Sequence, residues 1–274
     1  MQKTVLITGG NSGIGKATAK QLAQQSWNVI IATRSSDKAQ QAIHDIKKDV
    51  PNATISHLQV DLSNLESVRQ LADKVKSQYA SLDALINNAG GLWKERSETP
   101  TGIEYSFAAN HLGHFLLTNL LLEPLRNAKA ARIINVSSEI HRIAKFDLDQ
   151  YVRGSAYNSW KNYGFNKLCN VLFTYQLARQ LKDTSITVNA LHPGVIASNF
   201  GQDIGWMRFV SPLMKLFLGS TDKGARPSVS LATRIDPPNS SYFKEMKLVQ
   251  SSPESYNETH QNSLWEYSAQ LCQL

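Results

Sequence analysis

Two tyrosine–lysine pairs in one short stretch have the spacing for acid–base chemistry. In the segment SAYNSWKNYGFNKLCNVL (155–172), Tyr157 lies four residues before Lys161, and Tyr163 lies four before Lys167. On a helix, residues four apart share a face. An ammonium group beside a phenol favours loss of the phenolic proton. Either pair would therefore supply a tyrosine acid or base, and the residues alone leave both pairs open.

A glycine-rich turn near the N-terminus indicates a nucleotide site. Gly9, Gly13 and Gly15 form the pattern T-G-x-x-x-G-x-G between an apolar strand pattern and a helical one. Without side chains, this backbone can approach a pyrophosphate, and the N-terminus of the helix stabilises its charge. A purely structural turn is the alternative, but the order strand, loop and helix favours a nucleotide. The residues expected to bind it are Gly9, Asn11, Ser12, Gly13, Ile14 and Gly15.

The ends of the next strand patterns indicate which dinucleotide is bound. A site for NAD usually has an acidic residue at the end of the second strand, where this chain has Arg34 and Ser35. An arginine pairs with a 2′-phosphate by charge and bidentate hydrogen bonds, so the sequence predicts NADP. A solvated loop arginine is the alternative for Arg34, and a helix cap is the alternative for Asp61. Further cofactor contacts are expected from Asp61, Leu62, Asn88, Ala89 and Gly90, at the ends of the third and fourth strands.

The alternation of strand and helix patterns predicts the fold class. Apolar runs at 3–8, 28–33, 54–60, 83–87, 132–137 and 186–191 read as strands buried on both faces. Helical patterns lie between them, including 16–25, 65–79 and 167–181, and a last helix is expected over 253–271. The chain is thus expected to be α/β, a single-domain Rossmann-type doubly wound parallel sheet with helices on both faces. With 274 residues it would form one domain over 1–274.

The composition excludes several classes of protein. The net charge of +7 comes from scattered basic residues with no nucleic-acid-binding motif, so nucleic acid is not an expected partner. Two distant cysteines fit no metal site and suggest a reducing compartment. The first residues enter a strand pattern at once, and no apolar run approaches the ~18 residues of a spanning helix. We therefore expect a cytoplasmic protein without a leader or membrane anchor.

These motifs together resemble the classical short-chain dehydrogenase/reductase family, and within it the retinol dehydrogenase-like group. The resemblance rests on the glycine motif, on N-N-A-G at 87–90, on Ser137-Ser138, on Y-x-x-x-K and on Pro193-Gly194. The segments NHLGHFLLTNLLLEPL (110–125), NKLCNVLFTYQLA (166–178) and HPGVIAS (192–198) are close to that group. One departure is Asn166, at the position before the lysine, where the family usually has serine.

The resemblance implies a catalytic tetrad, which matches Asn110, Ser138, Tyr163 and Lys167 here. Tyr163 fits better than Tyr157 because the family's helix continues from Lys167, and because Tyr163 lies 30 residues before Pro193. Tyr157 and Lys161 are expected in a polar approach to that helix. Ser137 fits less well than Ser138, since one residue along a strand reverses the face. The family's chemistry is hydride transfer from NADPH, with the tyrosine giving or taking the proton, the serine binding the substrate oxygen, Lys167 holding the ribose, and Asn110 positioning a water. Pro193 and Gly194 are expected beside the nicotinamide.

The expected substrate is an apolar carbonyl compound or its alcohol. Residues 201–219 are rich in apolar side chains. We expect the segment 195–225 to cover the substrate. Within it, Trp206 and Phe209 would contact the substrate, together with Ser138 and Tyr163. Ordinary core packing or contact with a membrane surface are the alternatives for this segment. Competing functions are reduction of a more polar carbonyl and a catalytically silent NADP-binding redox sensor. His111, His114 and His141 are expected to be structural and no metal is expected; a homodimer is allowed but not required.

Overall fold

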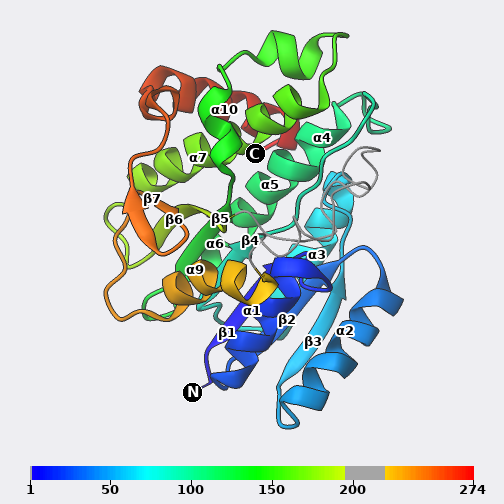
Figure 1. The fold of residues 1–274 in the computed structure, drawn as a ribbon, viewed down its shortest axis with the longest axis vertical. Coiled ribbons are helices and arrows are strands. Elements are labelled where there is room, and N and C mark those ends of the chain that lie inside the picture. The colour runs from blue at the N-terminus through cyan, green and yellow to red at the C-terminus, as the bar shows by residue number, and fades with distance from the viewer. Residues whose placement is uncertain (1, 195–219) are drawn as a thin grey trace.

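An eight-stranded sheet forms the centre of the computed structural model, which describes residues 2–194 and 220–274. The strands follow the order β3-β2-β1-β4-β5-β6-β7-β8, and every neighbouring pair is parallel except β7 with β8. Their bounds are β1 (Thr4–Thr8), β2 (Asn28–Thr33), β3 (Ile55–Gln59), β4 (Ala84–Asn87), β5 (Arg132–Val136), β6 (Thr187–His192), β7 (Ser241–Lys244) and β8 (Lys247–Val249). Figure 1 shows helices on both sides of this sheet.

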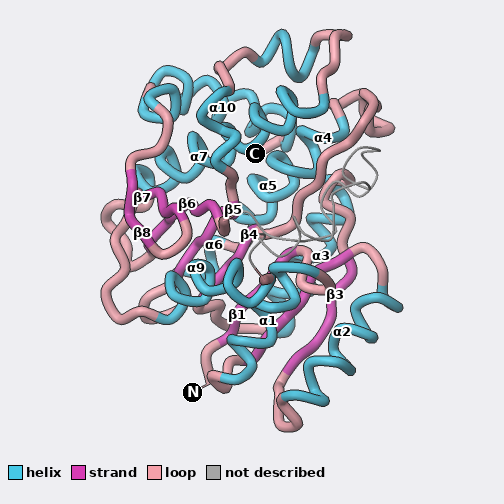
Figure 2. The backbone as a smooth tube through the Cα atoms, viewed as in Figure 1, coloured by secondary structure: helices cyan, strands magenta, loops and turns pink. Residues whose placement is uncertain are grey.

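The helices vary widely in length, and several are single turns (Figure 2). The α-helices are α1 (Gly13–Gln24), α2 (Ser36–Asp49), α3 (Leu65–Gln78), α4 (Tyr105–Phe107), α5 (Gly113–Leu120), α6 (Leu122–Asn127), α7 (Ser159–Gln180), α9 (Thr221–Thr233) and α10 (Glu258–Cys272). The π-helical turns are η1 (Ala108–Leu112) and η3 (Asp149–Arg153), and the 3₁₀ turns are η2 (Glu139–Ile143) and η5 (Pro253–Tyr256).

Alternate residues of the central strands enter two separate cores. Leu6 and Ile30 belong to the core that contains the buried faces of α3, α5, α7 and α10. Their neighbours Ile7 and Ile31 belong to the core beneath α1, α2 and α9. A side-chain period of two sends successive residues to opposite faces, so strands covered on both faces must be apolar throughout. This explains the continuous apolar runs in the sequence and confirms the predicted fold class.

The chain order places a topological switch point at the carboxyl ends of β1 and β4. From β1 the chain runs outward through β2 and β3, then returns to form β4 on the other side of β1. At such a switch point the loops diverge, and ligands of doubly wound sheets bind there. The glycine turn follows β1 and the N-N-A-G motif follows β4, so both motifs lie at this switch point.

The C-terminal region differs most from the sequence-based expectation. The expected helix over 253–271 is two elements, η5 and α10, in which Leu264 is buried and Trp265 and Leu271 pack against the core. The strands β7 and β8 were not predicted, and β8 is antiparallel. Helix α7 begins at Ser159, eight residues before the apolar pattern that indicated it. Its first two turns mix polar residues with aromatic ones, and this mixture gives no clear apolar period.

Two further predictions concern surfaces. Among the described residues, none of the helices is both long and apolar enough to cross a membrane. Helices α5 and α7 pack against α10 of the same chain: the ring centroids of Phe115 and Trp265 lie 4.9 Å apart. A homodimer stays a prediction, as do the cytoplasmic location and the absence of nucleic acid. The segment 195–219 lies outside the described residues.

Candidate active site

The glycine turn between β1 and α1 leaves no room for side chains. Gly9 has φ +69°, a left-handed conformation that favours glycine. A Cβ on Gly15 would lie 2.3 Å from the carbonyl oxygen of Gly9. Ser12 precedes α1 but makes no side-chain capping hydrogen bond, so the amides of the first turn are not satisfied by it. The turn therefore fits an anionic group at the N-terminus of α1.

Thr8 ties this turn to the end of β4. Its hydroxyl oxygen accepts hydrogen bonds from the backbone amides of Asn88 (2.9 Å) and Ala89 (3.0 Å). It also lies 2.9 Å from His114 Nε2, whose ring is buried. In addition, the side-chain amide of Asn88 donates a hydrogen bond to the carbonyl oxygen of Thr8 at 2.9 Å. The residues predicted at 88–90 are thus brought beside the glycine turn.

The end of β2 presents Arg34 at the surface. Its guanidinium group donates a hydrogen bond to the hydroxyl of Tyr105 at 3.2 Å, and the Tyr105 ring meets the edge of Trp93 at a centroid distance of 5.3 Å. The Ser35 hydroxyl accepts from the Lys38 amide and caps α2. The Asp61 carboxylate is occupied by the amide and hydroxyl of Ser63, a turn before α3 and not the helix cap considered as its alternative.

Tyr163 and Lys167 lie one helical turn apart within α7, with the ammonium group 5.6 Å from the centre of the phenol ring. Lys167 Nζ donates to the carbonyl oxygen of Val136 at the end of β5, 2.9 Å away. Desolvation by the surrounding protein lowers the pKa of Lys167 to about 8. Desolvation also raises the pKa of Tyr163, although a side-chain hydrogen bond with Ser138 opposes the rise.

The two serines after β5 face opposite ways. The hydroxyl of Ser137 is buried and donates to the carbonyl oxygen of Lys167 at 2.8 Å. Ser138 is partly exposed, accepts a weak bond from the Ile140 amide at 3.4 Å, and bonds Tyr163. The alternation along the strand thus brings Ser138, and not Ser137, to the phenol.

Asn110 is held in the π-helical turn η1 beside Lys167. Its side-chain oxygen accepts from the amide of Gly91 at 2.9 Å, and its side-chain nitrogen donates to the Gly91 carbonyl at 3.0 Å. A Cβ on Gly90 would lie 2.8 Å from Asn110 Oδ1 and 3.2 Å from Lys167 Nζ. Gly90 therefore permits the approach of both side chains, and π-helical turns of this kind are frequent at functional sites.

The alternative pair, Tyr157 and Lys161, does not form a tyrosine–lysine unit. Tyr157 precedes the first residue of α7, and its hydroxyl donates to the carbonyl oxygen of Trp93 at 3.0 Å. Lys161 lies in the first turn of α7 and is exposed, so it is inside the helix and not in the approach to it. Because Tyr157 is outside the helix, the two side chains do not share a helix face.

The remaining predicted residues occupy different parts of the chain. Asn166, the departure from the family pattern, is buried away from the phenol and donates to the hydroxyl of Ser106 at 2.9 Å. Pro193 and Gly194 follow β6 at the carboxyl edge of the sheet, Gly194 with φ +95°. Trp206 and Phe209 lie outside the described residues. His111 contacts Asn170 and Ser268 through its two ring nitrogens. In the described ranges, no group of three or more His, Cys, Asp or Glu could hold a metal ion.

Sequence reasoning missed several residues of this region because their partners are distant in the chain. Thr8 is the first residue of the pattern T-G-x-x-x-G-x-G, and the pattern gives its hydroxyl no separate role. Tyr105 carried no signal for contact with Arg34, 71 residues away. His141 was assigned a structural role, yet its ring lies 2.7 Å from the carbonyl oxygen of Ser138.

Comparisons with known proteins show which family the chain resembles over its whole length. A family model described as short chain dehydrogenase matches residues 3–207. Retinol dehydrogenase 12 of Mus musculus is 38% identical over 271 residues, covering 98% of this chain and 86% of that protein. A crystal structure of a protein from Mycobacterium paratuberculosis is 32% identical, with a TM-score of 0.81, over 99% of this chain and 94% of that one. A protein from Shigella flexneri, complexed with NADP, is 20% identical with a TM-score of 0.72, over 89% and 97% of the two chains.

Proposed function

The chain belongs to the short-chain dehydrogenase family, and from that premise we propose that it is an NADP-dependent oxidoreductase interconverting an apolar aldehyde or ketone and its alcohol. One observation carries the proposal. Tyr163, Lys167 and Ser138 meet at the carboxyl edge of the sheet, on the same edge as the glycine turn after β1. A proton donor and a dinucleotide cradle on one edge are what carbonyl reduction needs.

The residues present fit a dinucleotide phosphate. The glycine turn would hold the pyrophosphate against the N-terminus of α1, and it can close this tightly because a Cβ on Gly9 or Gly15 would collide with the neighbouring turn. Arg34 would pair with a 2′-phosphate, and the crystallised relative from Shigella flexneri binds NADP. Asp61, Leu62 and residues 88–90 would contact the adenosine, and Lys167, Pro193 and Gly194 the nicotinamide ribose and ring. When bound, NADPH supplies the hydride.

Tyr163 is suited to give a proton in the reduction. Desolvation raises the pKa of Tyr163, which keeps the phenol protonated at neutral pH but makes it a weaker acid, so the transfer depends on stabilisation of the phenolate that forms. As a carbonyl carbon is reduced, the substrate oxygen gains charge and takes the proton from the Tyr163 hydroxyl. Lys167, with a pKa of about 8, is mostly an ammonium at pH 7 and stabilises the phenolate left behind. Alcohol oxidation runs the same proton transfer backwards.

Ser138 and Asn110 complete the arrangement. The Ser138 hydroxyl would donate to the substrate oxygen, next to Tyr163, and stabilise its developing charge. The Asn110 side chain is fixed by both polar groups of Gly91, which sets the position of the π-helical turn beside Lys167. In the family this asparagine positions a water that links the lysine to solvent, and we assign the same role here.

The substrate proposal rests on the relatives. The name of retinol dehydrogenase 12 refers to retinol, an apolar polyene alcohol. We therefore infer that the substrates are long-chain aldehydes, retinal-like compounds or bulky ketones. Each buried CH₂ contributes ~0.8 kcal/mol, so kcat/KM should rise steeply along an aldehyde series. We retain a single domain over 1–274, with the segment 195–225, including Trp206 and Phe209, covering the substrate. A flat response to chain length would favour a polar carbonyl instead.

A matched pair of variants tests the mechanism. Tyr163→Phe removes the exchangeable proton and keeps the ring, so turnover should fall about a thousand-fold or more while NADPH still binds. Tyr157→Phe makes the same chemical change six residues earlier and should retain near-normal turnover. NADPH oxidation with a panel of aldehydes and ketones gives the rates, and fluorescence titration gives the cofactor affinity. The reverse result would reject Tyr163, and no turnover with any carbonyl would favour a silent NADP-binding sensor.

A further inference from the structure

The imidazole of His141 is buried and uses both of its nitrogens. Nδ1 lies 2.7 Å from the carbonyl oxygen of Ser138, and Nε2 lies 3.0 Å from the backbone nitrogen of Ser252. The Ser252 amide can only donate, so Nε2 must accept. In a neutral ring the proton then resides on Nδ1, which donates to Ser138. This tautomer follows from the partners, and protonation of Nε2 would break the bond with Ser252.

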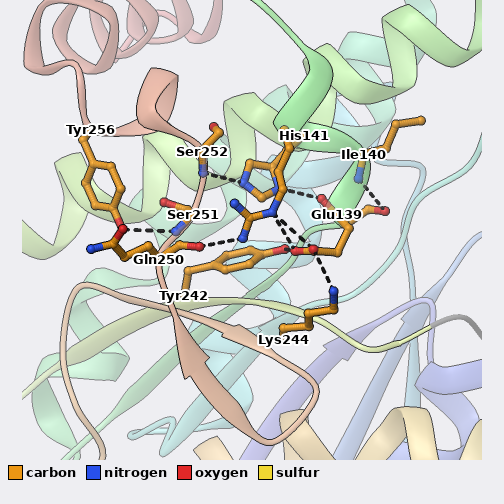
Figure 3. A network of polar contacts seen from close by, with 11 residues as sticks. Glu139, Ile140, His141, Tyr242, Lys244, Gln250, Ser251, Ser252 and Tyr256 are labelled. Atoms are coloured by element: carbon orange, nitrogen blue, oxygen red, sulfur yellow. Dashed lines mark hydrogen bonds and ion pairs between the residues drawn. The ribbon is translucent and has the colours of Figure 1, made fainter.

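The turn that carries His141 is joined to the C-terminal region by several contacts (Figure 3). Arg142 donates to the carbonyl oxygen of Gln250 at 2.6 Å. Glu139 accepts from the hydroxyl of Tyr242 and from Lys244 Nζ, each at 3.1 Å. The Tyr242 ring also lies 4.8 Å from the His141 ring, centre to centre. The turn after Ser138 is therefore held by segments more than 100 residues away in the chain.

His141 is the member of this network that touches Ser138 through its side chain. The Ser138 carbonyl accepts both the His141 amide, at 3.0 Å, and the imidazole Nδ1. Two hydrogen bonds to this carbonyl oxygen fix the peptide plane after Ser138, and with it the Cα–Cβ direction from which the Ser138 hydroxyl reaches Tyr163. Two other buried imidazoles, those of His111 and His114, contact different residues. Burial lowers the pKa of His141 to about 4, so the neutral ring persists at physiological pH.

We propose that His141 is a positioning residue, which sets the orientation of the Ser138 hydroxyl through the Nδ1–carbonyl bond and couples it to the segment around Ser252. The proposal rests on the proposed function, in which Ser138 binds the substrate oxygen. Positioning of this kind acts on the chemical step, because a displacement of about 1 Å can cost about a hundred-fold in rate.

Asparagine and glutamine at position 141 separate the two bonds of the ring. The amide nitrogen of Asn occupies nearly the place of Nδ1 and can donate to the Ser138 carbonyl. The Gln amide reaches nearly the place of Nε2 and can accept from Ser252, but it leaves the Ser138 carbonyl to the backbone amide alone. We expect His141→Asn to retain kcat within about three-fold, and His141→Gln to lower it about ten- to hundred-fold. KM and NADPH affinity should be unchanged in both.

A merely structural role gives a different result. Each variant loses one hydrogen bond, so packing alone predicts similar melting temperatures and similar kcat values for Asn and Gln. Equal kcat values would therefore overturn the proposal, as would losses that appear in KM or in NADPH affinity. His141→Ala serves if either variant fails to fold, because it removes both hydrogen bonds of the ring. It should lower kcat at least as much as His141→Gln, with KM and NADPH affinity unchanged, and an unchanged kcat would count against the positioning role.

Combining His141→Gln with Ser138→Ala distinguishes failure of this inference from failure of the proposed function. If His141 acts through Ser138, His141→Gln should lower turnover by less than about two-fold when Ser138 is already alanine. An equal loss in both backgrounds would reject the positioning role. Full activity of the single variant Ser138→Ala would reject the proposed function itself, whatever the behaviour of the His141 variants.

Discussion

The two halves of the sheet hold their functional groups by different means. At the ends of β1 and β4, the cofactor edge consists mainly of backbone, shaped by Gly9 and Gly15. At the ends of β5 and β6, the catalytic edge consists of buried polar side chains whose partners come from distant segments, such as Ser252 for His141. A site built from backbone needs glycines, which have no side chain, at fixed positions within a short motif. Side-chain sites require a complete set of hydrogen bonds, so they depend on the whole fold.

Acid should destabilise the buried polar side chains first, and this is the largest expected effect. His111 and His114 are fully buried, with pKa values lowered to about 4 and about 3 by burial, against about 6.5 when unfolded. The unfolded chain therefore binds more protons between about pH 3 and 6.5, and stability falls as pH drops through this window. At pH 5 each ring should cost about 2 kcal/mol relative to pH 7.

Urea unfolding at pH 7 and pH 5 measures this loss. His111→Asn keeps a polar side chain but cannot titrate in this range, so the difference between the two pH values should shrink by about 2 kcal/mol. A variant with the wild-type pH dependence would show that His111 is not the source. If the wild type were equally stable at pH 5 and pH 7, its buried polar side chains would not depend on a complete set of hydrogen bonds. The contrast between the two kinds of site would then fail.

Gly15→Ala should damage only the cofactor half. The new Cβ would lie 2.3 Å from the Gly9 carbonyl and 2.5 Å from Asn88 Nδ2, so the turn must shift. Overpacking of this kind costs about 1–3 kcal/mol, which predicts a ten- to hundred-fold loss of NADPH affinity. Gly102→Ala separates backbone strain from steric overlap: nothing lies within 4 Å of its Cβ position, but its φ of +77° disfavours a side chain, so it should lower stability without lowering NADPH affinity. A loss of kcat at saturating NADPH would mean that the halves are not separable.

The same contrast explains how much the sequence could predict. The glycine turn and the apolar strands β1 to β6 are local patterns, so the fold class and the cofactor edge could be inferred from short stretches. The Tyr163–Lys167 pair is also local, since both residues lie on one helix. The bond between His141 and Ser252 spans 111 residues, and nothing near either residue indicates the other. Strands β7 and β8 were missed because they are short and partly exposed, which weakens their apolar signal.

The preference for NADPH over NADH should depend on Arg34, whose side chain lies at the cofactor edge that is otherwise built mainly from backbone. Arg34→Asp replaces the partner of the 2′-phosphate with a repelling charge. Hydrogen bonds to charged groups contribute ~1.5–3 kcal/mol, so NADPH affinity should fall about ten-fold or more. NADH affinity, measured on the same variant, should hold or improve because NADH has no 2′-phosphate. Tighter binding of NADH than of NADPH by the wild type would remove Arg34 from the phosphate site.

Tyr105→Phe should have the smallest effect on NADPH affinity, and it tests whether the cofactor edge relies on side chains as well as backbone. The Tyr105 hydroxyl accepts a hydrogen bond from Arg34 at 3.2 Å, at an exposed site where such bonds contribute little. Its ring packs against Trp93, and phenylalanine would keep that contact. If the bond holds Arg34 ready for the 2′-phosphate, NADPH affinity should fall about two-fold, with kcat and NADH affinity unchanged. In the Arg34→Asp background the same change should have no effect on NADPH, because the two residues would act as one unit. A loss of similar size in both backgrounds would instead mean that Tyr105 acts independently of Arg34, and that the cofactor half relies on side chains more than its glycine turn suggests.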